Sequence, residues 1–320
     1  MTSWAVPWMA LLVALGATAR DFPQPQRVAD GVYVLEGARE HFSRANSGDI
    51  ANTGFIATPA GAVVIDTGAS LRYGQAQRAA VRAATGRDAV QVYITHAHPD
   101  HFLGNQAYAD VPVQALRSTA ERIARDGDTL AQNLYLLVGS AMAGTVVRPP
   151  TALAAPVLPK GEVSQPPTVV AFGGRRLQLI ALQGHSAADL AVFDEATGTL
   201  FAGDLVFFER APTTPDADIA PWLAALDRLA QLPVRVLVPG HGPVVRGPEA
   251  IAQTRDYLLW VQSALHEAAA HGLDMNEAMQ LQAPERLRRL AVLQAEWQRT
   301  VVHLYPAAEQ GSLPRAAAAR

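Results

Sequence analysis

The stretch THAHPDH, residues 95–101, places four potential metal ligands within six residues at the end of an apolar run. Residues 90–94 predict a buried strand, and alternate residues of a strand lie on the same face. His96 and His98 are therefore expected to point at one ion. Pro99 restricts the backbone of His98 to extended values, which stiffens this arrangement.

Asp100 and His101 come just after the expected strand end, in a loop that opens a helix. They approach the same place from another direction, where a second ion would fit. Burying three histidines and a carboxylate together without a cation would leave costly unpaired polar atoms. The cluster therefore predicts metal binding.

The composition of the chain is that of a folded globular protein. Its 320 residues are enough for one large domain with an appendage. Hydrophobic residues make up 49% of the chain and charged residues 17%, a composition that argues against disorder. The net charge of -3 gives no electrostatic reason to expect a nucleic-acid partner. Because the chain has no cysteine, every metal ligand must be His, Asp or Glu.

The N-terminus carries an apolar run, residues 4–17, that ends at Ala17-Thr18-Ala19. This pattern predicts a signal peptide over residues 1–19, and hence export, with the periplasm as the expected compartment. No Lys or Arg precedes the run, so an uncleaved anchor or a misplaced start stays open as the alternative. No other stretch is long and apolar enough to cross a bilayer, so no stable membrane span is expected after leader removal.

The main domain, expected over residues 28–247, contains two strand-rich halves, each followed by helices. A helix is expected over 70–85 and a long one over 118–138, capped by Ser118. Two β-sheets packed together and covered by helices are predicted from this layout. Residues 248–304 are expected to form a helical extension, and residues 311–320 a disordered tail. The sequence gives no indication of the oligomeric state.

Three further polar residues stand where apolar strands of the second half stop: His185, Asp204 and His241. Each has glycine beside it, which lets the backbone turn sharply. Taken singly, each is equally explained as a turn or surface residue. Together with the first cluster they predict a site for two metal ions.

This set resembles the metallo-β-lactamase superfamily, whose His-x-His-x-Asp-His pattern followed by a separate His, Asp and His is complete here over about residues 31–245. The resemblance implies an α/β fold, a four-layer αββα sandwich of two mixed β-sheets flanked by helices. It implies two zinc ions with these ligands: His96, His98 and His185 for the first, Asp100, His101 and His241 for the second, and Asp204 bridging both. Asp66, in the motif VVIDTG, would orient a ligand histidine, with simple turn stabilisation as the alternative.

The implied chemistry is hydrolysis of an ester or thioester by a hydroxide that bridges the metals, with Asp100 and Asp204 as catalytic residues. Superfamily β-lactamases that use cysteine at the bridging position are excluded, because this chain has Asp204 there. The arrangement looks more like the thioesterase and lactonase branches, such as glyoxalase II.

Two segments, residues 42–55 and 209–215, look like the quinoprotein relay system zinc metallohydrolases and the SoxH-like proteins. Those families are exported and associated with periplasmic quinoprotein or sulfur oxidation, and a small-molecule or carrier-linked substrate is expected. The resemblance implies a cleft lined by Asn46, Asn52, Phe207, Phe208, Glu209 and Arg210. Loops held by their own Asn and Pro turn chemistry are the alternative.

Two other functions share the same ligands. Persulfide dioxygenases of the superfamily bind one Fe²⁺ through two His and an Asp and oxidise a sulfur substrate. A non-catalytic accessory protein that binds a cofactor or carrier at the metal site is the third class. The remaining histidines, His41, His266, His271 and His303, match no motif and are interpreted as structural.

Overall fold

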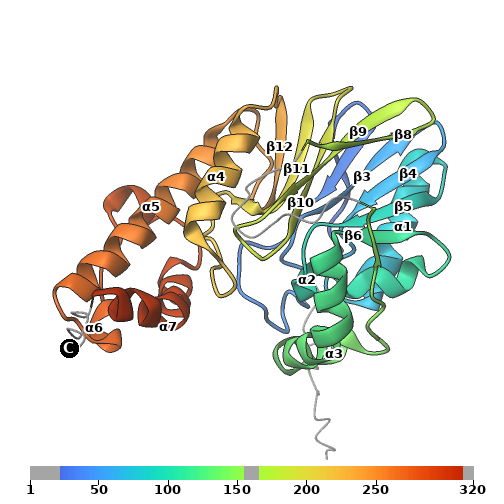
Figure 1. Ribbon diagram of the computed structural model, residues 1–320. Coiled ribbons are helices and arrows are strands. Elements are labelled where there is room, and N and C mark those ends of the chain that lie inside the picture. The colour runs from blue at the N-terminus through green and yellow to red at the C-terminus, as the bar shows by residue number, and fades with distance from the viewer. Residues whose placement is uncertain (1–21, 155–165, 313–320) are drawn as a thin grey trace, which may run out of the picture.

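The computed structural model describes residues 22–154 and 166–312, and two β-sheets lie at its centre (Figure 1). The first sheet has the strand order β1-β2-β3-β4-β5-β6-β7, and the second β12-β11-β10-β9-β8. Both sheets are mixed, because β4 to β7 pair in parallel after an antiparallel meander and β12 pairs in parallel with β11.

The strands have these bounds. The first sheet contains β1 (Gln26–Ala29), β2 (Val32–Leu35), β3 (Thr53–Thr58), β4 (Gly61–Ile65), β5 (Ala89–Ile94), β6 (Val113–Ala115) and β7 (Thr151–Ala152). The second contains β8 (Thr168–Phe172), β9 (Arg175–Leu182), β10 (Asp189–Asp194), β11 (Thr199–Phe207) and β12 (Val236–His241).

The helices lie outside the sheets (Figure 1). Those that follow the first-sheet strands are α1 (Leu71–Thr85), α2 (Pro99–Phe102), η1 (Leu103–Tyr108), α3 (Arg117–Val138) and η2 (Gly139–Met142). Those of the second half are α4 (Ile219–Ala230), α5 (Glu249–Ala270), α6 (Met275–Met279), η3 (Glu285–Leu287) and α7 (Leu293–Ser312).

Side chains of the sheet strands alternate between two apolar cores, as a sheet buried on both faces requires. In β4, Ala62 and Val64 join the core under α1 and α3, whereas Val63 and Ile65 join the core between the sheets. A third core joins the second sheet to α4, α5 and α7. Three cores separate four layers, so the predicted αββα sandwich is confirmed.

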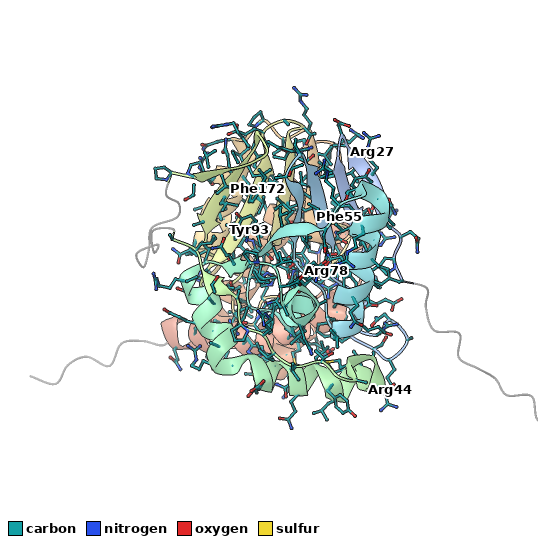
Figure 2. All side chains as sticks on the ribbon, turned by 90° about the vertical axis from the view of Figure 1, so that its right-hand side faces the viewer. Arg27, Arg44, Phe55, Arg78, Tyr93 and Phe172 are labelled. Carbon is teal, nitrogen blue, oxygen red and sulfur yellow. The ribbon has the colours of Figure 1, made fainter. Side chains whose placement is uncertain are left out.

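Figure 2 shows the first sheet through its side chains, with Phe55 and Tyr93 labelled on its strands. Both rings are at most 2% exposed, although they belong to different cores. The sheet is therefore covered on both faces, which leaves its strand ends as the place where polar groups can gather.

The helix predictions differ from the structure mainly at their ends. Ser70 caps α1 and accepts a hydrogen bond from the backbone N–H of Tyr73. The predicted cap at Ser118 is wrong, because α3 begins one residue earlier, after Leu116, and no side chain caps it. The C-terminal extension is interrupted between α5 and α7, and its last helix continues to Ser312.

Two predicted segments fall outside the described residues. The predicted signal peptide, residues 1–19, lies there entirely, as do residues 313–320 of the predicted tail. Within the two described ranges, no helix combines the length and the hydrophobicity that a bilayer span requires.

The two sheets are joined at one edge by backbone hydrogen bonds. The N–H of Asn52 donates to the carbonyl of Gly240 at 2.7 Å, and the N–H of Leu190 donates to that of Thr95 at 2.8 Å. The strand ends that carry the predicted ligands are therefore held close together, although they come from different sheets.

Candidate metal centre

The local sequence after β5 sets the direction of the first ligands. His98 has extended backbone angles, φ -95° and ψ 144°, and Pro99 begins the short helix α2. Proline disfavours the helical region for the residue before it, so the chain turns into the helix only after His98. His96 and His98 thus lie before the helix, and Asp100 and His101 within it.

The seven predicted ligands converge into two adjacent clusters, in each of which the ligand atoms lie within 4.8 Å of one another. The first consists of His96, His98, His185 and Asp204, and the second of Asp100, His101 and His241. All are buried except His98, which is half-buried.

Asp204 touches both clusters. Its Oδ2 lies 3.4 Å from His185 Nε2 and 3.3 Å from His241 Nε2, and its Oδ1 lies 3.2 Å from His101 Nε2. Asp100 Oδ2 lies 3.4 Å from His241 Nε2. Asp204 thus has the position that a carboxylate shared by two ions requires.

Outer hydrogen bonds fix the ring orientation of three ligand histidines. His101 Nδ1 lies 2.8 Å from Asp66 Oδ2, and His241 Nδ1 lies 2.9 Å from the carbonyl of Ile50. The hydroxyl of Thr95 donates to Asp66 and lies 3.0 Å from His96 Nδ1, so it is available to accept from that ring. Each Nδ1–H then points outward, which leaves the Nε2 lone pair facing the centre.

Asp66 accepts from three donors at once. Besides His101, the backbone N–H and the hydroxyl of Thr95 each donate to it at 2.8 Å. Its φ of +57° is unusual for a residue other than glycine, but aspartate is among the side chains that tolerate it. The structure therefore places Asp66 where it orients a ligand histidine.

Burial keeps two of the ligand histidines neutral. It holds the pKa of His96 well below its usual value and lowers the pKa of His185 to about 3. Neutral imidazole is the form that binds a metal.

The ligand set fits cations rather than a purely hydrogen-bonded core. His96 Nε2, His101 Nε2 and Asp204 Oδ1 are buried and have no hydrogen-bond partner in the described part of the chain. Unpaired buried acceptors that face one another are costly unless a cation lies between them. The two clusters therefore fit a pair of metal ions.

The sequence profile described as Metallo-beta-lactamase superfamily matches residues 46–241. The chain belongs to this superfamily. The matched region ends at the last residue of β12, so α5, α6 and α7 lie beyond it.

The curated relatives that the chain matches are distant in sequence. The chain is 21% identical over 292 residues to a linear primary-alkylsulfatase of Pseudomonas sp. (strain ATCC 19151), covering 81% of this chain and 55% of the relative. It is 25% identical over 196 residues to a beta-lactamase-like protein 2 homolog of Caenorhabditis elegans, covering 61% of this chain and 56% of the relative. The chain thus spans about half the length of the curated relatives it matches.

Solved superfamily structures share the fold. A metallo-beta-lactamase from Pontibacter korlensis has a TM-score of 0.57 and 23% identity, with 74% of this chain and 99% of that chain covered. A metallo beta lactamase from Hirschia baltica has a TM-score of 0.57 and 18% identity, with 74% of this chain and 97% of that chain covered. At these identities the likeness concerns the fold alone.

Glycine is required beside the metallo-β-lactamase ligands for steric reasons. A Cβ on Gly240 would lie 1.9 Å from Asp204 Oδ1, and one on Gly203 would lie 2.9 Å from Thr95 Cβ. The glycines next to these ligands therefore provide close approach between strands, in addition to the sharp turns expected from the sequence.

The sequence did not indicate Asp216. Its Oδ2 lies 2.9 Å from His98 Nε2 and 2.8 Å from Arg122 Nη2. This contact leaves His98 Nδ1 facing His185 Nε2 at 3.0 Å. The one feature of the sequence that could have pointed to Asp216 is its position directly after the segment 209–215.

Five of the six predicted cleft residues do not line the cavity beside the metal centre. Asn46 accepts hydrogen bonds from two backbone N–H groups of its own loop, and Asn52 donates to the carbonyls of Pro239 and Gly242. Both organise loops, which is the alternative that turn chemistry predicts.

The other three do not face the cavity either. The Phe207 ring stacks on His241 with centroids 5.2 Å apart, and Phe208 packs against the core of the second sheet. Glu209 pairs with Arg39 at the surface. Arg210 is the predicted cleft residue that does line the cavity.

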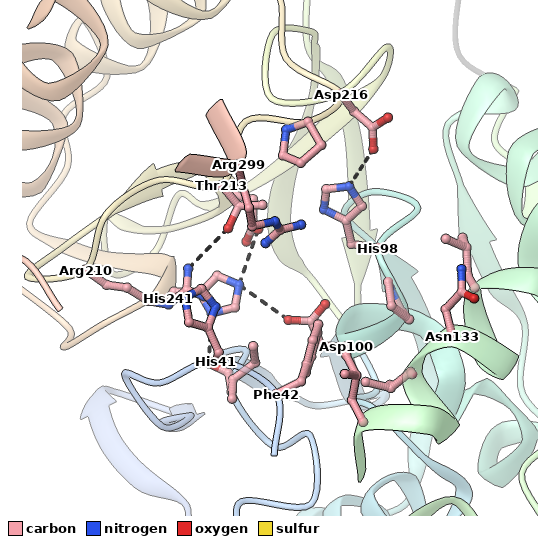
Figure 3. Close-up of a pocket in the computed structure, with 17 residues that line it drawn as sticks. His41, Phe42, His98, Asp100, Asn133, Arg210, Thr213, Asp216, His241 and Arg299 are labelled. Atoms are coloured by element: carbon pink, nitrogen blue, oxygen red, sulfur yellow. Dashed lines mark hydrogen bonds and ion pairs between the residues drawn. The ribbon is translucent and has the colours of Figure 1, made fainter. Parts of the chain in front are cut away.

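The cavity has a volume of about 220 Å³ and opens beside the metal centre. Figure 3 shows Arg210, Thr213, Arg299 and His41 gathered on one side of it, with Asn133 on the other. His41, which the sequence pattern suggested was structural, is thus part of the wall. His41 adjoins the segment 42–55 but matches no motif itself, and Arg299, which shares its wall, comes from the far end of the chain.

Proposed function

We propose that the protein is a dinuclear zinc hydrolase that cleaves ester or thioester bonds. The observation that carries the proposal is the position of Asp204 between the two histidine clusters. A carboxylate that lies within 3.4 Å of ligand histidines of both clusters fits a pair of adjacent dications. Imidazole and carboxylate donors without a thiolate suit zinc.

The residues of the chain hold and orient this centre. A bound zinc pair supplies a nucleophile at neutral pH and polarises the oxygen of a scissile carbonyl. Asp66, Thr95 and Asp216 hold ligand rings in position through their hydrogen bonds. Asp100 lies 3.4 Å from His241 and lines the cavity, which supports a role for its carboxylate in orienting the attacking group.

The wider context of the enzyme follows from the two segments that look like quinoprotein relay system and SoxH-like proteins. Both contribute to the cavity wall, through Phe42 in the first segment and Arg210 and Thr213 in the second. With the expected signal peptide, this supports an exported enzyme of a periplasmic quinoprotein- or sulfur-oxidation system. A small-molecule or carrier-linked ester or thioester is its proposed substrate.

Metal analysis combined with a substrate panel tests the proposal. Protein purified without added metal is expected to contain about two zinc ions per chain. The panel contains carboxylic esters, thioesters and, because one relative is named an alkylsulfatase, an alkyl sulfate. Asp204→Ala is expected to abolish turnover and weaken metal retention. Asp227→Ala, at a surface ion pair with Arg255, is the matched control.

Three results would contradict the proposal. One iron per chain with oxygen uptake would favour a persulfide dioxygenase. Turnover that Asp204→Ala leaves unchanged would place the reaction elsewhere. A metal-loaded protein that hydrolyses no member of the panel would favour an accessory protein.

A further inference from the structure

The cavity beside the metal centre has a cationic wall that the metal ligands do not use. Arg210 and Arg299 line it, and a single carboxylate, Glu296, lies between them. Arg299 Nη1 lies 3.2 Å from Glu296 Oε1, and Arg210 Nη2 lies 3.6 Å from the same oxygen. Two guanidinium groups against one carboxylate leave a net positive charge at this wall.

Arg210 is poorly satisfied for a buried arginine. Its side chain is 2% exposed, yet its Nη1 contacts, to the carbonyl of Ala211 and the hydroxyl of Thr213, are both 3.4 Å long. Its Nε is buried and has no hydrogen-bond partner among the described residues. Burial also lowers its pKa, which measures the cost of holding this charge away from water. A purely structural arginine would be expected to have shorter contacts.

Arg299 has a different environment. Its side chain is 47% exposed and reaches the cavity from α7, outside the region that the superfamily profile matches. Because it keeps access to solvent, it is available to a ligand entering the cavity. Arg122, another cation near the cavity, is already paired with Asp216.

The opposite wall is mainly apolar, although Asn133 also lies on it. Leu130, Leu134 and Leu137 of α3 line the cavity, together with Phe42. Leu137 is 52% exposed, and Tyr135 and Leu136, just before it in the last turn of α3, are exposed as well. An apolar wall that extends to the surface beside a cationic wall selects for molecules that carry both kinds of group.

We propose that Arg210 and Arg299 bind an oxyanion that the substrate carries away from its scissile bond, while the leucines of α3 contact its apolar part. The anion is a carboxylate, a sulfonate or a sulfate, which share the oxygen geometry that a guanidinium recognises. The substrate class is therefore an amphiphilic, anionic ester or thioester. The ester or thioester part of this inference rests on the proposed function. The anion-binding subsite itself can be tested by binding measurements, without any turnover.

The binding test uses hexanesulfonate, which is inert to hydrolysis and a weak metal ligand. Calorimetry on the metal-loaded protein is expected to show that Arg299→Gln raises Kd about tenfold, the effect of a lost charged hydrogen bond. Arg299→Lys is expected to recover part of the affinity. Arg286→Gln removes an exposed charge of the same extension, paired with Asp256 outside the cavity, and is expected to leave Kd unchanged.

The turnover test compares two esters of equal acyl length, 4-nitrophenyl valerate and mono-4-nitrophenyl glutarate. The second carries a terminal carboxylate. The ratio of the glutarate KM to the valerate KM is expected to rise about tenfold in Arg299→Gln and to stay constant in Arg286→Gln. Thermal unfolding of each variant checks that the fold is kept, and because Arg299 is half-exposed, its replacement is expected to fold.

The outcomes separate the subsite from the reaction. The subsite proposal is overturned if hexanesulfonate does not bind the wild-type protein, or if it binds Arg299→Gln as tightly as the wild type. Either result counts regardless of whether the esters are hydrolysed. An equal loss of affinity in Arg286→Gln overturns it as well. Binding that depends on Arg299, with neither ester hydrolysed, supports the subsite and counts against the proposed ester hydrolysis.

Discussion

Asp216 Oδ2 lies 2.9 Å from His98 Nε2, although 118 positions of sequence separate the two residues. This contact determines which nitrogen of His98 faces the other ligands. The same oxygen accepts a hydrogen bond from Arg122 Nη2 at 2.8 Å, which also fixes the orientation of the carboxylate.

Replacing Asp216 by Asn is expected to weaken binding of the metal held by His96, His98 and His185 by about 10- to 100-fold, because the amide can present its N–H to the ring and no longer fixes the tautomer. Competition with a chromogenic chelator measures the affinity. Arg122→Gln, which leaves the carboxylate in place, is expected to have a smaller effect. Equal affinities of wild type and Asp216→Asn would show that the contact does not position His98.

Replacing Gly240 by Ala is expected to displace Asp204, because the added Cβ would lie 1.9 Å from its Oδ1. The expected result is loss of at least one metal ion per chain and a decrease in stability of about 1–3 kcal/mol. Metal analysis and urea unfolding measure the two effects. Gly311→Ala, where a Cβ meets open space, is the control. Full metal content in Gly240→Ala would contradict the close packing of β11 against β12.

Arg175 joins the two sheets. It donates to both oxygens of the buried Asp194 in the second sheet, and to the carbonyls of Asp30 and Ala57 in the first. Arg175→Met leaves the Asp194 charge without its cation, and the free energy of unfolding is expected to fall by about 3–5 kcal/mol.

The neighbouring Arg176 supplies the control, because its pair with Glu195 is exposed. Arg176→Met is expected to cost at most about 1 kcal/mol in urea unfolding. Similar losses in both variants would argue against a special role for the contact between the sheets.

Arg78 of α1, labelled in Figure 2, donates two hydrogen bonds of 3.0 and 2.8 Å to the carboxylate of Asp88. These bonds hold the pKa of Asp88 well below its usual value. A carboxylate whose pKa is depressed on folding stabilises the protein above its unfolded-state pKa of about 4, and this contribution is lost as the pH falls further.

The stability difference between wild type and Asp88→Asn is therefore expected to be largest near neutral pH and to shrink below about pH 4. Its size is about 1 kcal/mol, since the carboxylate is partly exposed. Chemical unfolding of both proteins without metal, from pH 3 to 7, measures it. A difference that grows toward acid pH would contradict the assignment.

Much of the centre was predictable because its signals are local in the chain. His96 and His98 stand two positions apart just after the apolar run of β5, and Asp204 and His241 stand beside glycines at the ends of apolar runs. The strand face that the two histidines were expected to share is wrong, because β5 ends at Ile94 and both lie beyond it. The layer order was predictable for the same reason, since a strand that is apolar throughout, such as β4, must bury both faces.

The cavity wall was not predictable from local signals. Asn46 and Asn52 looked like cleft residues, but their amides hydrogen-bond loop backbone, whereas His41 and Arg299 reach the wall from opposite ends of the sequence. Such contacts depend on how α7 packs against the rest of the protein. The residues next to His41 and Arg299 in the sequence do not indicate that packing.

The sequence by itself determined the two-sheet fold and the seven residues that gather in the two clusters, because residue chemistry and short-range periodicity are properties of the chain. Only the tertiary structure decided that Asp216 orients His98 and that Arg210 meets Arg299 across Glu296. The physical reason is that side chains far apart in sequence are brought within hydrogen-bonding distance only when the layers pack, and the chemistry of each residue alone does not specify its partner.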